Sequence, residues 1–198
     1  MPEQRSEEQA HTVKDLTVDA IKALGDVATA AIDAFGGTLV AALQRARQVS
    51  TEANGLIASS VKNIIQTAAE TGQDLAKAAS STVIGAVRAS KEAGTEIIEA
   101  VATTAGAVVK STADIGGDVA GAAKGAVEGA IRGAREVGAS AEDAASAAAE
   151  GAVKAARNVG GAIGGQVRDA VTGTISGVKV ILREPFRNNH DDKPGTAS

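Results

Sequence analysis

The chain has 198 residues and a net charge of −4; 44% of its residues are hydrophobic, 1% are aromatic, and Cys, Trp and Tyr are absent. Because aromatic and large aliphatic side chains supply much of the buried area of a core, this composition makes a deep, shaped pocket hard to build. The acidic balance and the shortage of stacking aromatics argue against a nucleic-acid binder, and the lack of Cys excludes disulfides and thiolate metal sites.

Residues 1–8 are polar and form a short lead-in, and the beginning of the chain lacks the apolar stretch of a secretory signal. The most apolar window, residues 27–43, contains Asp33 and the pair Gly36–Gly37. That window is too short and too interrupted for a typical membrane-spanning helix. We therefore expect a cytoplasmic protein.

An 11-residue repeat follows and keeps its phase through residues 9–184, which makes sixteen copies. Two of the clearest are IIQTAAETGQD at residues 64–74 and AVRASKEAGTE at residues 86–96. Eleven residues in three turns is about 3.67 residues per turn, close to a relaxed α-helix. The repeat predicts an all-α protein built on an elongated amphipathic helix. Since a loop would normally shift the phase, we expect a continuous helix rather than separate hairpins, with the glycine pairs as alternative bend sites.

Apolar side chains gather in repeat positions 8, 1, 5, 9 and 2, which share one wedge of roughly 130° on such a helix. Position 2 is the most regular of these columns, although Asn54 and Glu142 interrupt it. We expect its large members to form the apolar interaction face: Ile21, Ile32, Leu43, Ile65, Val87, Ile98, Val109, Ile131, Val153 and Ile175.

Charged residues line the two edges of this stripe. The basic flank, at position 6, comprises Lys14, Arg47, Lys91, Lys124, Arg135, Arg157, Arg168 and Lys179. The acidic flank, at position 11, comprises Asp19, Glu52, Asp74, Glu96, Asp118 and Glu184. Two parallel helices on one surface would bring the basic flank of one beside the acidic flank of the next. The columns therefore predict parallel self-association that weakens as salt is added.

Glycine is unusually frequent, with 23 residues. Each costs about 1 kcal/mol relative to alanine inside a helix, so we expect the helix to be marginally stable or disordered alone in water. Five glycines from Gly117 to Gly133 are spaced four apart, which resembles the small-residue pattern of closely packed helices. This row predicts close helix contact as an alternative to a solvated face.

Pro185 ends the array, and residues 185–198 are predicted to form a disordered tail. His11 and His190 lie near opposite ends of the chain, where a solvated position is the simplest interpretation. No set of residues predicts a catalytic, cofactor-binding or metal-binding site, and we expect no enzyme activity, no cofactor and no small-molecule substrate.

These repeats resemble the 11-residue motifs of group 3 late-embryogenesis-abundant proteins, and synucleins, apolipoproteins and lipid-droplet coat proteins share the same period. The resemblance implies little structure in water, helix formation on drying or on lipid, and no catalysis. The chain departs from the late-embryogenesis pattern in being less hydrophilic, with a mean hydropathy of +0.03 and 22% charged residues.

Three functions remain open. The first is a coat on a lipid, droplet or polymer-granule surface, peripheral to that surface, with the stripe buried and the charges in water. The second is a stress or desiccation protectant of the late-embryogenesis kind. The third is a self-assembling bundle or filament in which helices bury their stripes against one another.

Overall fold

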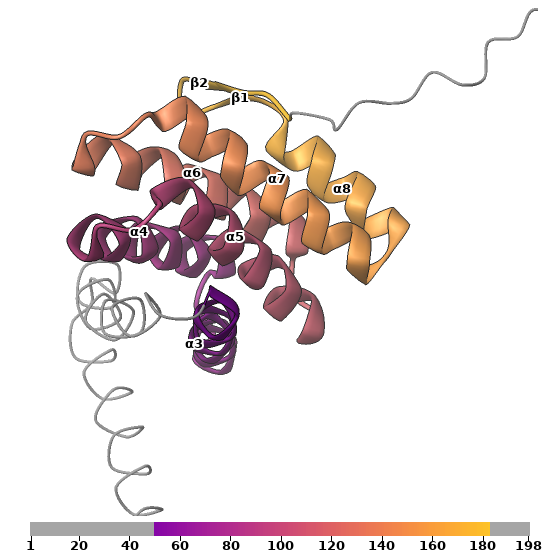
Figure 1. Ribbon diagram of the computed structural model, residues 1–198. Coiled ribbons are helices and arrows are strands. Elements are labelled where there is room, and N and C mark those ends of the chain that lie inside the picture. Colours follow the sequence, from indigo (N-terminus) through magenta and orange to yellow (C-terminus); the bar gives the residue numbers. More distant parts are fainter. Residues whose placement is uncertain (1–49, 183–198) are drawn as a thin grey trace, which may run out of the picture.

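The computed structural model describes residues 50–182, which form six helices and a short hairpin (Figure 1). The elements are α3 (Ser50–Glu70), α4 (Leu75–Ala93), α5 (Ile97–Asp114), α6 (Val119–Val137), α7 (Ala141–Val159), α8 (Gly161–Val171), β1 (Gly173–Ile175) and β2 (Val178–Val180). The predominance of helix confirms the all-α class. Outside the described residues lie the lead-in, the tail, both histidines, Ile21, Ile32, Leu43, Lys14, Arg47, Asp19, Glu184 and the side chain of Glu52.

The expectation of one continuous helix is wrong for the described part of the chain. Gly72, Gly94, Gly116 and Gly138 have φ angles of +67°, +64°, +69° and +73°, a conformation that glycine adopts readily and that ends a helix. Successive members of this series lie 22 residues apart, the length of two repeat copies. One helix and its turn together fill two copies, so the chain reverses direction without shifting the phase of the stripe.

The helices alternate between two rows, α3–α5–α7 and α4–α6–α8 (Figure 1). Among α4, α5, α6 and α7, helices that follow one another in sequence are antiparallel and helices two apart are parallel neighbours, whereas α3 is seen nearly end-on beside them (Figure 1). The parallel direction is evident where α4 meets α6, because Ala76 lies opposite Gly125 and Ser80 lies opposite Gly129. The tightest packing in the described fold is α4 on α6 and α5 on α7.

Glycine brings these parallel neighbours close together. A Cβ atom added at Gly125 would overlap the backbone carbonyl of Ala76, and one added at Gly129 would overlap that of Ser80. Gly151 of α7 meets the carbonyl of Ala102 of α5 in the same way. The structure therefore confirms the close helix contact that the row of glycines spaced four apart predicted.

Alanine, valine and isoleucine fill the core between the rows. The largest fully buried side chains are Ile65, Ile131, Val61, Val83, Val87, Val101, Val108, Val109, Val127, Val167 and Val171, with Thr104 among them. Alanine supplies most of the remaining buried positions on α6 and α7. Such a core is closely packed but thin, since alanine contributes little apolar area.

The expected helix also fails over residues 173–180, where β1 and β2 form an antiparallel hairpin. Ser176 and Gly177 carry positive φ angles of +48° and +78°, as a two-residue hairpin turn requires. Val178 and Val180 are buried, β2 packs on α7, and Arg135 Nη2 donates to the Ser176 carbonyl at 3.2 Å. The hairpin thus packs on α7 and is bonded to the last turn of α6.

Candidate functional site

The residues of the predicted apolar face lie mostly inside the folded chain. Ile65, Val87, Val109 and Ile131 are at most 1% exposed. Val153 and Ile175 are each 5% exposed, the latter on the hairpin. Ile98, the second residue of α5, is 40% exposed. In this conformation the other helices of the same chain occupy the stripe, so a surface can contact it only after the helices rearrange.

The acidic flank coincides with the starts of helices. Asp74 is the N-cap of α4, and its Oδ1 accepts from the backbone N–H groups of Ala76 at 2.9 Å and Lys77 at 3.2 Å. Asp118 caps α6 by accepting from Gly121 N–H at 2.9 Å. Glu96 holds the same place before α5, without a side-chain capping bond. These carboxylates satisfy free N–H groups and suit the positive end of the helix dipole.

The basic flank coincides largely with helix ends. Lys91, Arg135, Arg157 and Arg168 lie in the last turns of α4, α6, α7 and α8, where a positive charge suits the negative end of the dipole. Lys124 is exposed on α6 and Lys179 is exposed on β2. The two charge columns therefore have a role within single helices. The sequence does carry a signal for this capping role. A glycine followed two residues later by an acidic residue recurs every 22 residues, at Gly72–Asp74, Gly94–Glu96 and Gly116–Asp118.

Between the parallel neighbours α4 and α6, an ion pair joins two residues of the polar faces that belong to neither flank. Arg88 of α4 donates to Glu136 Oε2 of α6 from Nη2 at 2.8 Å and from Nε at 3.0 Å. Arg132 of α6 also donates to Ser80 Oγ of α4 at 3.2 Å. Because the Arg88 and Glu136 side chains are 37% and 39% exposed, solvent screens them, and such a pair contributes less than about 1 kcal/mol. The pair orients α4 on α6 more than it stabilises the fold.

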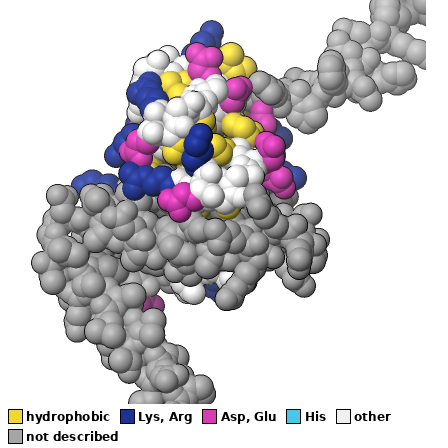
Figure 2. Space-filling view, turned by 60° about the vertical axis from the view of Figure 1, so that its left-hand side comes forward, with side chains coloured by type: hydrophobic (Ala, Val, Ile, Leu, Met, Phe, Trp, Pro, Cys, Tyr) yellow, Lys and Arg dark blue, Asp and Glu magenta, His cyan; other side chains and the backbone are white. Residues whose placement is uncertain are grey.

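On the face that Figure 2 shows, lysine and arginine side chains are interspersed with aspartate and glutamate, and hydrophobic side chains lie between them. Among residues 50–182, no cluster of three or more His, Asp or Glu side chains is placed to hold a metal ion. Within the same residues, every helix is too short or too polar to cross a membrane.

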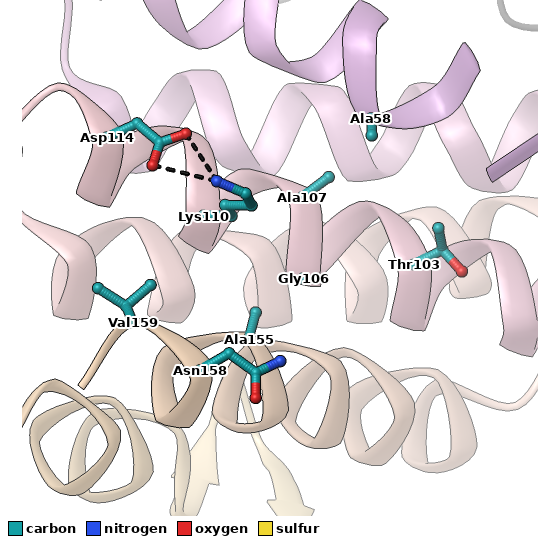
Figure 3. A pocket seen from close by; sticks show the side chains of 9 residues that line it. All are labelled: Ala58, Thr103, Gly106, Ala107, Lys110, Asp114, Ala155, Asn158 and Val159. Atoms are coloured by element: carbon teal, nitrogen blue, oxygen red, sulfur yellow. Dashed lines mark hydrogen bonds and ion pairs between the residues drawn. The ribbon is translucent and has the colours of Figure 1, made fainter. Parts of the chain in front are cut away.

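A groove of about 480 Å³ runs along the outer side of α5 (Figure 3). Its floor is Thr103, Gly106, Ala107 and Lys110 of α5, with Ala58 of α3 on one side and Ala155, Asn158 and Val159 of α7 on the other. The Lys110 ammonium lies 3.0 Å from a carboxylate oxygen of Asp114, four residues on. Both side chains of this ion pair are well exposed, at 68% for Lys110 and 46% for Asp114.

No protein-family model, no curated protein and no solved structure matches this chain. The stripe, the turns and the packing of the chain itself are therefore the features that bear on its function.

Proposed function

We propose that this protein is a non-enzymatic coat for a lipid, droplet or polymer-granule surface, to which it binds peripherally by turning its apolar stripe from the bundle core to that surface. The observation that carries the proposal is the unbroken phase of the repeat across every turn between α3 and α7. A bundle alone does not need a helix-plus-turn unit that is a whole multiple of 11 residues. A stripe that packs in a bundle and also binds a surface does need such a unit, because all its copies must face the same way.

The thin core supports an exchange of partners. Burying a valine or isoleucine stabilises either state by about 1.5–3 kcal/mol, whether the partner is another helix or an apolar surface. Large aromatic side chains, which would fix the bundle strongly, are nearly absent from the chain. The closed and surface-bound forms therefore lie close in free energy, and an apolar surface shifts the population between them.

The connections determine which contacts must break. Turns cross between the two rows at both ends of the helices, so the rows cannot swing apart about one edge without breaking turns. If α4 leaves α6 and α5 leaves α7, however, the helices can lie side by side in sequence order with every turn intact. This single layer presents all the stripes to one surface.

A crosslink between α4 and α6 tests the proposal. The chain has no Cys, so Arg88→Cys with Glu136→Cys can be joined selectively by a short bismaleimide. The control is Lys110→Cys with Asp114→Cys, also an exposed ion pair, which joins two residues of one helix. Both proteins should float with phospholipid vesicles before crosslinking. Afterwards the α4–α6 crosslink should abolish flotation and the control should retain it.

Equal flotation of the two crosslinked proteins would contradict the opening step, since the closed bundle would then bind as it stands. A lack of flotation by the uncrosslinked protein on vesicles and on oil droplets alike would contradict the coat itself.

The packing of stripe on stripe also favours a second candidate, a helical assembly in which parallel helices of other copies extend the rows. Sedimentation should then show a mass that rises with protein concentration and falls as salt is added. A monomer at all concentrations leaves the surface coat as the better account.

A further inference from the structure

Three hydroxyl groups are buried in the core without a hydrogen-bond partner among residues 50–182. They belong to Ser90 of α4 and to Thr104 and Thr112 of α5, and each of these residues is 0% exposed. A buried polar group in this state destabilises the closed fold, because it has lost its bonds to water and gained none from the protein.

Other buried hydroxyls in α4 have partners. Thr82 Oγ1 donates to the Ala78 carbonyl at 2.7 Å, and Ser80 Oγ accepts from Arg132. The unpaired groups are thus a local feature of the core and not a general property of its hydroxyl residues.

The repeat shows how the defect is distributed along the chain. Ser90 and Thr112 occupy the same place in successive 22-residue units, and the next two units have Ala134 and Ala156 there. All four residues are buried. The unpaired hydroxyls are therefore confined, within the described residues, to α4 and α5, whereas α6 and α7 have alanine at this position.

We propose that these three hydroxyls determine where the bundle opens: α4 and α5, with the turn between them, leave α6 and α7 first. Each unpaired hydroxyl regains water when the pair opens, and α6 and α7 gain nothing comparable. Gly94 holds the turn between them without backbone strain, because its φ of +64° is accessible to glycine at little cost. The opening itself takes place in water and does not depend on the proposed function. Only its use in binding a surface rests on that function.

Hydrogen exchange of the full chain, without vesicles, tests the site of opening. Amides of α4 and α5 should exchange faster than those of α6 and α7. In the combined variant Ser90→Ala, Thr104→Val and Thr112→Val, the opening equilibrium of α4 and α5 should fall at least tenfold, with little change in α6 and α7. Thr82→Val is the matched control, since its hydroxyl already has a partner, and it should not slow exchange.

Equal protection of all four helices in the unmodified protein would overturn the inference, as would an equal effect of Thr82→Val. The single variants Thr104→Val and Thr112→Val, each checked for unchanged helix content, should carry part of the effect and guard against misfolding of the combined variant.

Vesicle binding separates this inference from the proposed function. The combined variant has a more apolar stripe, so surface affinity alone predicts faster binding, whereas a requirement for opening predicts slower binding. Faster binding together with slower exchange would support the proposed opening site but contradict its role in surface binding.

Discussion

At the residue scale, glycine determines how closely the helices approach. Gly125 and Gly129 allow α6 to lie directly against backbone carbonyls of α4, a spacing that any side chain at these positions would prevent. Gly165 of α8, in contrast, has open space beside it. The cost of glycine in a helix is therefore offset by packing at some positions and not at others.

Replacing Gly125 by alanine should destabilise the protein by about 1–3 kcal/mol, because overpacking against the Ala76 carbonyl outweighs the gain in helix propensity. Gly165→Ala should instead stabilise it by up to about 1 kcal/mol. Urea unfolding, with the slope of the transition compared between variants, measures both. Stabilisation by both substitutions would show that α4 and α6 are not in close contact.

At the scale of the element, α4, α5 and α6 are units of one cycle: an N-cap residue, about five turns of helix and a turn with a left-handed glycine. Asp118 illustrates the start and Gly138 the end of α6, with Arg135 in its last turn. Because the caps recur at the same repeat position, acidic residues form a column in the sequence that resembles the edge of a surface-binding stripe.

Asp118→Ala should reduce the free energy of unfolding by about 1 kcal/mol, since the Gly121 N–H loses its acceptor. Glu96→Ala provides the comparison, as its side chain makes no capping bond, and it should cost clearly less. Thermal unfolding followed by circular dichroism measures the difference. A cost for Glu96→Ala equal to that for Asp118→Ala would mean that charge at the column matters more than the capping bond.

At the scale of the whole molecule, the two-row arrangement places residues close together that a continuous helix would hold far apart. Lys77 of α4 and Lys124 of α6 are both exposed, and each is next to a residue of the Ala76–Gly125 contact. On one continuous helix these two positions, 47 residues apart, would be separated by about 70 Å.

Spin labels at Lys77→Cys and Lys124→Cys should therefore report, in water, a separation near the roughly 10 Å spacing of packed helices, lengthened by the label linkers. On vesicles, α5 would lie between α4 and α6 in the single layer, so the separation should about double. A distance near 70 Å in water would contradict the fold, and an unchanged distance in a vesicle-bound sample would contradict the rearrangement.

The sequence by itself determined the helical class and the buried face. A period near 3.67 residues places Ile65, Val87, Val109 and Ile131 on one side of a helix whatever the helix packs against, and all four are buried. It also offered, as an alternative to a solvated face, the close helix contact that Gly125 makes, because residues four apart share a helix face.

Only the tertiary structure decided what the stripe contacts. Gly94 ends a helix and Gly125 lies within one, although they are the same residue type; Glu96, the N-cap of α5, follows two residues after Gly94, whereas the repeat period treats the two glycines alike. Arg88 has a possible partner four residues on, in Glu92, yet it also pairs with Glu136, 48 residues away. The turns escaped prediction because helix and turn together span two repeats. Periodicity fixes an angle around a helix axis, and it carries no information on whether that axis continues or reverses.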